Sequence, residues 1–386
     1  MKKCSIERGG HTLELYLGQL SYAEVDAMIE DLYDMAKKQK TPELIRQREK
    51  HPSPLKRSYE VHGLLPDGII LQIYQQFQIP SAIRIIINPS TFTSGSYIPE
   101  ALYHPKEYPG VLQKVVSLLD ETFSNTQEHR CWKLDHRHLS LSRVDLTWNL
   151  YLPQETEVTD LIRLFKQSGR KKKDTVITFS NPLLDKHSFR LKRGDMMLTV
   201  YDKQFQISQR TKQPVHPKKQ QILRIEFAMR RKEYLSVMKL SRDMPFDQVL
   251  WRMITAIDSI PERYLEKLFP CTGSHWRYPE AKKLIETADL SGKMKEQMLF
   301  LLKKASRCRS LTAAVEQLQT EYGISTKGMK RIWREFDRLD VNPITLPKQS
   351  KLSQFASFRT ILLNEFLMRC GSKKEYFCGE RKIGEN

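Results

Sequence analysis

The sequence lacks a long apolar run, and this absence excludes an ordinary membrane protein. No hydrophobic stretch within the 386 residues reaches the length of about 20 residues that a membrane-spanning helix needs. The opening Met1-Lys2-Lys3-Cys4 is followed by charge and not by the apolar core of a secretory signal. We therefore expect a cytoplasmic protein without a membrane partner.

Paired cysteines are also missing. The six cysteines are scattered without the close spacing that a zinc site or a disulfide framework shows: Cys4, Cys131, Cys271, Cys308, Cys370 and Cys378. Free thiols in a reducing cytoplasm fit this pattern best.

Acidic residues are in deficit: 45 Asp and Glu face 64 Lys and Arg, for a net charge of +19. This balance favours a polyanionic partner, because contact with Lys and Arg releases the counterions that a polyanion holds. Charge alone leaves DNA, RNA and lipid surfaces open.

Hydrophobic periodicity predicts an α+β fold, in which an antiparallel-sheet core with packed helices precedes an all-helical C-terminal domain. We expect four consecutive parts: an N-terminal strand and basic helix at 1–60, an α+β domain at 61–240, a helical domain at 241–345 and a basic tail, mobile near its end, at 346–386.

At finer detail, Ser21 and Glu24 form the pattern of a capping box, which predicts a helix to about Arg48. The other expected elements are hairpin strands at 68–74 and 82–87, a helix at 112–123, a loop at 180–195 and a hairpin excursion at 205–219.

The stretch 197–203 alternates as a half-buried strand does, with Thr199, Tyr201 and Lys203 on one face. A phenol beside a fixed positive charge suits attack on a phosphodiester, because both the nucleophile and the phosphorane carry negative charge in the reaction. The alternative is a strand end with an interfacial tyrosine and a solvated lysine.

A second strand contains Asp145. The alternation changes phase at Ser142 and Arg143, which predicts a β-bulge that re-aims the side chains beyond it. An acid in mid-strand is costly to bury unless a metal or a cation compensates its charge. An ion pair with Arg143 is the alternative to a metal site.

A third strand, 222–229, places Arg224 and Glu226 opposite its aliphatic side chains. If the three strands lie side by side, Asp145 and Glu226 meet Tyr201, and two carboxylates form a site for Mg²⁺ or Mn²⁺. Such a metal would polarise a phosphate for attack by a phenol whose ordinary pKa is about 10. An ordinary sheet with polar residues on its wet side is the alternative.

Two cationic clusters suit a phosphate backbone. The first follows a predicted helix and consists of Arg170, Lys171, Lys172 and Lys173; favourable interaction with the end of the helix dipole is the alternative. The second lies on the latter of two helices, 311–322 and 327–339, which resemble a helix-turn-helix or an ordinary helical hairpin. Its members are Lys327, Lys330, Arg331 and Arg334.

A histidine pair, His136 and His138, precedes the Asp145 strand. Paired histidines hold the metal in one class of nicking enzyme, but there a hydrophobic residue separates them, whereas Arg137 does so here. Solvated or phosphate-facing histidines are the alternative.

Three blocks together resemble the replication initiators of filamentous phages, the gene-II-type proteins, and the related initiators of rolling-circle plasmids. They are Ser-Arg-Val-Asp-Leu-Thr at 142–147, Leu-Thr-Val-Tyr-Asp-Lys at 198–203 and Leu-Arg-Ile-Glu-Phe-Ala-Met-Arg at 223–230. Their order and rough spacing agree with the family over residues 60–260.

The resemblance implies that Tyr201 attacks one strand of a double-stranded origin, becomes linked to its 5′ phosphate and frees a 3′ hydroxyl primer. It implies that Asp145 and Glu226 bind Mg²⁺ or Mn²⁺ and that Lys203 stabilises charge on the phosphate. Arg143 and Arg224 are expected to contact DNA. The displaced strand would later be rejoined.

The hypothesis is thus a phage- or plasmid-encoded nickase and strand transferase in the bacterial cytoplasm. Its partners would be double- and single-stranded origin DNA and the host helicase and polymerase. A DNA-binding protein that does not cut and an RNA-binding protein are the alternatives.

Overall fold

The structure is a computed structural model, and its α+β fold, with a large antiparallel sheet and several helices, confirms the predicted fold class. The residues that it describes are 2–47, 56–77, 79–96, 98, 101–103, 107–124, 139–153, 156–212, 220–241, 244, 248–249, 252, 259–364 and 374–378.

Contacts divide the chain into two compact units, each built from separate stretches of sequence. Unit 1 comprises Met1–Arg8, Trp148–Phe227 and Ile257–Asn386, and unit 2 comprises Gly9–Thr147 and Ala228–Ala256. Three strands therefore have residues in both units: β1 (Lys2–Leu20), β6 (Leu139–Leu152) and β10 (Gln221–Arg230). The four consecutive domains stay a prediction, because grouping by contacts does not test which parts fold independently.

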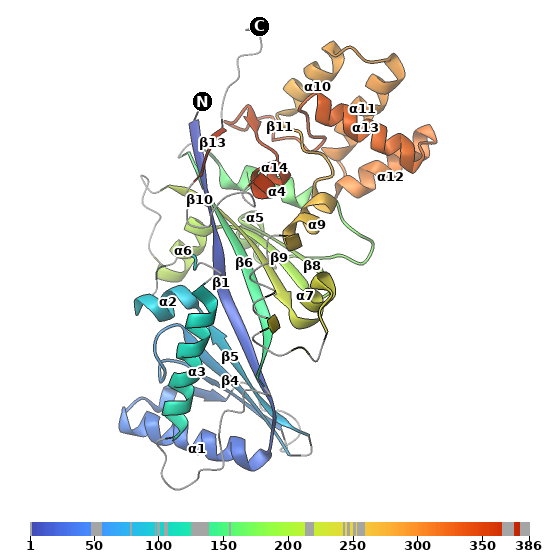
Figure 1. Ribbon diagram of the computed structural model, residues 1–386. Helices are drawn as coiled ribbons and strands as arrows, with labels where there is room; N and C mark the ends of the chain where they lie inside the picture. The colour runs from blue at the N-terminus through green and yellow to red at the C-terminus, as the bar shows by residue number, and fades with distance from the viewer. Residues whose placement is uncertain are drawn as a thin grey trace. The chain divides into compact units, whose positions relative to one another are not determined.

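Besides its share of those strands, unit 2 contains α1 (Tyr22–Lys38), the 3₁₀ turn η1 (Pro42–Leu44), β2 (Ile45–Gln47), β3 (Lys56–Val61), β4 (Ile69–Gln76), β5 (Ser81–Ile87), α2 (Pro89–Ser94), α3 (Tyr108–Ser124) and α7 (Arg231–Met238) (Figure 1). The strand order is β2-β3-β4-β5-β1-β6. Strands β4 and β5 pair antiparallel, with Ile69 opposite Ile87 and Tyr74 opposite Ala82. The predicted hairpin is confirmed.

The capping box of α1 is also confirmed: the Ser21 amide donates to Glu24 Oε2 at 2.6 Å, and the Glu24 amide donates to Ser21 Oγ at 3.2 Å. The predicted end of the helix near Arg48 is wrong. Helix α1 ends at Lys38, because Lys40 adopts a left-handed φ of 57° and Pro42 follows it. The chain then continues into β2.

Unit 1 contains α4 (Val158–Lys166), β7 (Thr175–Ile177), α5 (Pro182–Lys186), β8 (Ser188–Arg193), β9 (Met196–Asp202), α6 (Lys203–Thr211), α9 (Ser259–Leu268), β11 (His275–Trp276), α10 (Tyr278–Thr287), α11 (Gly292–Ala305), α12 (Leu311–Tyr322), α13 (Thr326–Arg338), β12 (Gln354–Phe355), α14 (Phe358–Asn364) and β13 (Lys374–Cys378). Its main strands follow the order β6-β10-β9-β8-β7.

Two predicted irregular segments of unit 1 are regular. The expected loop at 180–195 contains α5 and β8, and β8 pairs antiparallel with β9 around Gly194, whose φ is 60°. The expected hairpin at 205–219 begins instead as helix α6, which Asp202 caps by accepting the Phe205 amide at 3.0 Å.

Helices α10 to α13 agree with the helices predicted at 280–287, 293–304, 311–322 and 327–339, and they form one group in Figure 1. Helices α9 and α14 were not predicted, and the helix predicted at 246–260 lies largely outside the described residues. The only strands within described residues 259–364 are β11 and β12, a short antiparallel pair. The start of the predicted tail is packed, because Phe355, Phe358 and Ile361 are buried. No helix of the described segments has the length and apolarity to cross a membrane.

Candidate functional site

Tyr201 and Glu226 meet on neighbouring strands. Tyr201 lies near the end of β9 and Glu226 in β10, and these strands are adjacent in the sheet. The Tyr201 hydroxyl donates a hydrogen bond of 2.6 Å to Glu226 Oε1, and Tyr201 is only 8% exposed. The sheet therefore joins two residues that the sequence predicted would share a site.

The surroundings of Tyr201 disfavour its anion. Burial and the neighbouring Glu226 carboxylate raise the pKa of Tyr201 well above its ordinary value, whereas the charge of Arg224 and its hydrogen bond to the tyrosine act in the opposite direction. In this structure Tyr201 is thus a protonated phenol held by a carboxylate, with one cation beside it that favours the phenolate.

Arg224 is completely buried in β10, although a charged side chain on that face was expected to reach DNA. Its Nε donates to Asn149 Oδ1 in β6 at 2.7 Å. Burial of a guanidinium is tolerated when hydrogen bonds satisfy it. Arg224 therefore belongs to the hydrogen-bond network of Tyr201. It exposes no surface through which it could make the predicted contact with DNA.

The network continues from Asn149 to a second phenol paired with a carboxylate. Asn149 Nδ2 lies 3.5 Å from the Tyr151 hydroxyl, which donates to Glu7 Oε2 at 2.5 Å. Burial, followed by the bond to Glu7, raises the pKa of Tyr151. These partners come from β1 and β6, and the sequence-based prediction did not include them. The available signal was the alternation of β6, which places Asn149 and Tyr151 on the same strand face as Asp145 and Thr147.

Lys203 does not share a strand face with Tyr201, contrary to the prediction, because β9 ends at Asp202 and Lys203 begins α6. It is 1% exposed, and its Nζ donates to Gln206 Oε1 at 2.8 Å and lies 5.8 Å from the centre of the Tyr201 ring. The positive charge is therefore close to the phenol, but it reaches that position from a helix.

Sequence reasoning also missed His187 and Asp202. The His187 Nδ1 lies 3.1 Å from Asp202 Oδ2, and the imidazole stacks on Phe205 with 4.0 Å between ring centres. Asp202 follows Tyr201 directly in the sequence, which was the signal for it. Together they anchor the junction of β9 and α6.

Asp145 is 1% exposed and is paired with a cation. Arg143 Nε and Nη2 donate to its two carboxylate oxygens at 2.6 Å each, and Arg143 Nη1 donates to Glu14 at 3.0 Å. The ion pair that sequence analysis gave as the alternative to a metal site is present. Asp145 belongs to unit 2, whereas Tyr201 and Glu226 belong to unit 1, so the convergence of all three residues stays a prediction.

The described residues do not form a complete site for a divalent metal. Mg²⁺ and Mn²⁺ prefer several oxygen ligands, but Glu226 is the one carboxylate bonded to Tyr201 among them. No group of three or more His, Cys, Asp and Glu within the described ranges could hold a metal ion. His136 and His138 lie outside those ranges.

The cationic loop after α4 is held against the helical region. The Arg170 amide donates to Thr312 Oγ1 at 2.8 Å, and that hydroxyl donates to the Arg170 carbonyl at 2.8 Å. Lys171, Lys172 and Lys173 follow with exposed side chains. Thr312 lies in the first turn of α12, so the loop and the helix pair share a fixed contact.

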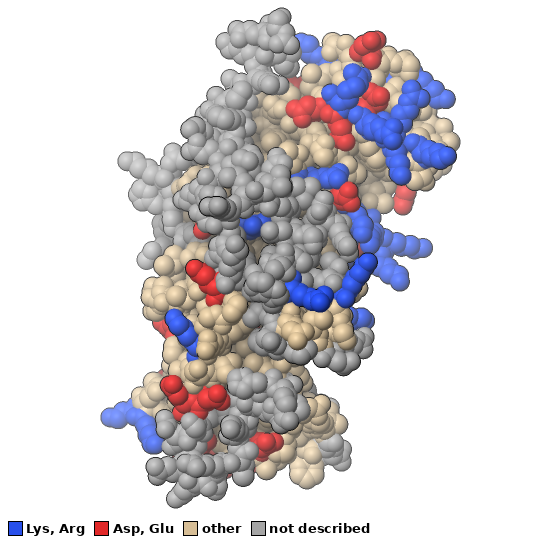
Figure 2. Space-filling model, in the orientation of Figure 1, with Lys and Arg blue, Asp and Glu red and all other residues tan. Residues whose placement is uncertain are grey.

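Helices α12 and α13 have the connection expected of a helix-turn-helix. Gly323 ends α12 with a φ of 61°, and Ser325 caps α13 by accepting the Gly328 amide at 3.3 Å. The predicted cations of α13 form an exposed stripe, and none has an ion-pair partner among the described residues: Lys327, Lys330, Arg331 and Arg334. Lys and Arg side chains gather over α10 to α13 in Figure 2.

No protein-family model and no curated protein matches the chain. The resemblance to phage and plasmid initiators therefore depends on the three sequence blocks, and it stays a prediction. The two blocks with Tyr201 and Glu226 contribute the residues that touch in unit 1.

Proposed function

We propose that the protein is a site-specific DNA nickase and strand transferase that initiates rolling-circle replication with Tyr201 as its nucleophile. The observation that supports this most is the 2.6 Å hydrogen bond from the Tyr201 hydroxyl to Glu226, next to buried Arg224. A structural tyrosine needs one partner for its hydroxyl. Here a carboxylate can accept its proton while a guanidinium favours the anion that results.

In the proposed reaction the Tyr201 oxygen attacks a phosphorus atom of one DNA strand. A bond between that oxygen and phosphorus forms, the bond to the 3′ oxygen breaks, and the 3′ oxygen leaves and takes a proton from water to become a hydroxyl. Glu226 takes the phenol proton. The phosphotyrosyl ester keeps the energy of the broken phosphodiester, so a 3′ hydroxyl can attack it later and reseal the strand.

DNA binding would be divided between the loop at 170–173 and the stripe on α13. Eight exposed or half-buried cations in these two places suit the phosphate backbone, and the second helix of a helix-turn-helix enters the major groove. A divalent cation is part of the proposal, with Glu226 and Asp145 as candidate ligands.

The test is incubation with supercoiled plasmid that carries the cognate origin, with Mn²⁺ or with a chelator, followed by a denaturing gel and peptide mapping. The expected result is a nicked circle, formed only with metal, and a DNA-linked peptide that contains Tyr201. An adduct on another residue would move the nucleophile elsewhere.

A protein that binds origin DNA without cutting it is the second candidate. The closed pair of Asp145 with Arg143 and the raised pKa of Tyr201 favour it, because both groups are inactive as they stand. This protein would shift origin DNA in a gel and leave the plasmid supercoiled in the presence of Mg²⁺ or Mn²⁺.

A further inference from the structure

A polar pocket of about 330 Å³ lies in unit 1, at the meeting of α4, α10, α11 and the chain at 345–349. Its lining contains four cations and no acid: Arg163, Lys303, Arg307 and Lys348. The four come from three separate segments, so the dipole at one helix end does not explain their gathering.

The cations of this pocket have no ion-pair partner within the described ranges. Asp160 interacts with Arg163 from one turn away on α4, but it accepts a hydrogen bond from Ser350 and does not line the pocket. All four side chains are exposed and line one cavity, so an anion in that cavity would be attracted by four positive charges.

Two further features of the pocket suit a ligand that has an aromatic base in addition to its negative charge. Tyr278 lines the pocket, and Lys348 Nζ lies 6.0 Å from the centre of its ring. Gln167 Oε1 is buried and accepts no hydrogen bond from any described residue. An aromatic ring offers a stacking surface for a base, and a glutamine amide pairs with a base edge.

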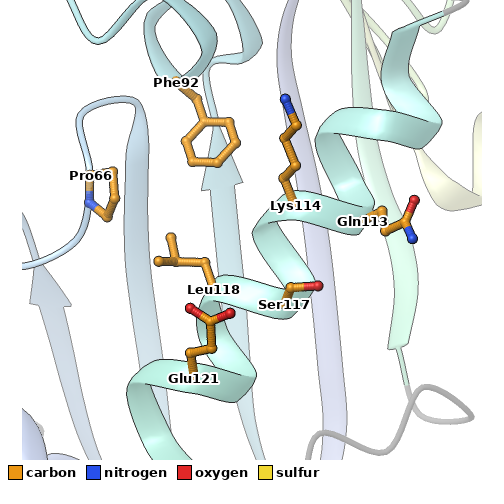
Figure 3. Close-up of a pocket in the computed structure, with 7 residues that line it drawn as sticks. All are labelled: Pro66, Phe92, Gln113, Lys114, Ser117, Leu118 and Glu121. Atoms are coloured by element: carbon orange, nitrogen blue, oxygen red, sulfur yellow. The ribbon is translucent and has the colours of Figure 1, made fainter.

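A pocket of unit 2 provides a contrast. It has a volume of about 470 Å³ and is formed by α3, Pro66 and Phe92 (Figure 3). Its charged residues are Lys114 and Glu121, which have opposite signs, and its lining therefore favours no charged ligand. The pocket of unit 1 combines one sign of charge with an aromatic ring and amides.

We propose that this pocket binds one nucleotide, with its phosphate on Arg163, Lys303, Arg307 and Lys348 and its base against Tyr278 and Gln167. The volume is at the lower end of the range for small-ligand sites, about 300–1,000 Å³, which suits a mononucleotide. The nucleotide is either free or one unit of a DNA strand. This inference does not depend on nicking by Tyr201.

Isothermal titration calorimetry of the full-length protein with dAMP tests the pocket. We expect Arg307→Gln and Lys348→Gln each to weaken dAMP binding about tenfold, the loss expected for one charge-assisted contact. Lys282→Gln on α10 removes the same charge outside the pocket and should bind as the wild type does. Failure of the wild-type protein to bind dAMP, or equal binding by Arg307→Gln, would overturn the proposal.

The base is tested separately with inorganic phosphate as a second probe. Tyr278→Leu should weaken dAMP binding and leave phosphate binding unchanged, and Tyr278→Phe should keep both. Phosphate binding as tight as dAMP binding would refute the nucleotide assignment.

Competition by a 5′-phosphorylated DNA trinucleotide would identify the strand as the source, and absence of competition would identify the free nucleotide. Nicking assays on the same variants keep this result separate from the fate of the proposed nickase.

Discussion

Unit 1 contains positively charged side chains in two opposite environments. Around Tyr201, Arg224 is fully buried and hydrogen-bonded, whereas the cations of α13 are exposed and have no ion-pair partner in the described part of the chain. Like charges at helical spacing destabilise a helix slightly, so an unpaired stripe needs another reason. The first region is thus fixed by its own hydrogen bonds, whereas the second would pair with DNA under the proposed function.

The sharpest way to break the comparison is to remove the phenol. Tyr201→Phe should lower nicking by a factor of about 10³ or more and abolish the DNA adduct, because the nucleophilic oxygen is lost. Tyr151→Phe is the matched control, since it also removes the hydroxyl of a half-buried tyrosine bonded to a glutamate. If Tyr151→Phe cuts as poorly as Tyr201→Phe, the loss reflects a damaged network and not a missing nucleophile.

The same substitution at two arginines compares the regions in stability. Arg224→Met should lower the free energy of unfolding by about 3 kcal/mol, because it leaves buried hydrogen-bond partners unsatisfied. Arg331→Met on α13 should change it by less than about 0.5 kcal/mol, since the side chain is exposed. Urea unfolding measures both, and equal effects would contradict the assigned burial.

For DNA binding we expect the exposed cations of α13 to matter, although they contribute little to stability. The double variant Lys330→Gln/Arg331→Gln should weaken binding to duplex DNA about tenfold and lower the slope of log affinity against log salt by about 1 to 2. Lys282→Gln/Lys283→Gln on α10 removes the same charge from another exposed helix. An equal loss in both double variants would mean that net charge, and not the α13 stripe, binds DNA.

The smallest expected effect concerns alkaline pH. The raised pKa of Tyr201 stabilises the folded state fully below the ordinary tyrosine pKa of about 10, and this stabilisation is lost as pH rises above it. Tyr201→Phe should therefore make the decline of stability above pH 10 shallower, by up to about 1.4 kcal/mol per pH unit. Thermal unfolding at pH 9 to 11 measures this, and coincident curves would refute the assigned environment.

Local chemistry made some elements predictable. Helices α12 and α13 follow from the left-handed Gly323 and the capping Ser325, and both signals are contained in three consecutive residues. The β4–β5 hairpin follows from two isoleucine-rich runs. By contrast, β8 reads Ser-Phe-Arg-Leu-Lys-Arg, and its charged residues concealed an alternation that only pairing with β9 stabilises.

The sequence predicted part of the candidate site, Tyr201 with Arg224 and Glu226, but it predicted neither the other members, such as Asn149 and Tyr151, nor the burial of the side chains. The alternation of β10 placed Arg224 and Glu226 on one face, as the structure has them, but it could not show that Arg224 is covered. Its covering partner, Asn149, is 75 residues away in sequence. A pattern of period two describes one strand, whereas burial depends on neighbours that tertiary structure brings together.

The hydrogen bond between Tyr201 and Glu226 has a consequence for the resting protein. A buried phenol that stays protonated and hydrogen-bonded to a carboxylate is a poor nucleophile toward any phosphodiester that is not specifically bound beside it. Under the proposed function, this latency would protect the host chromosome from nicking, because Tyr201 would react only when the origin strand is bound beside it.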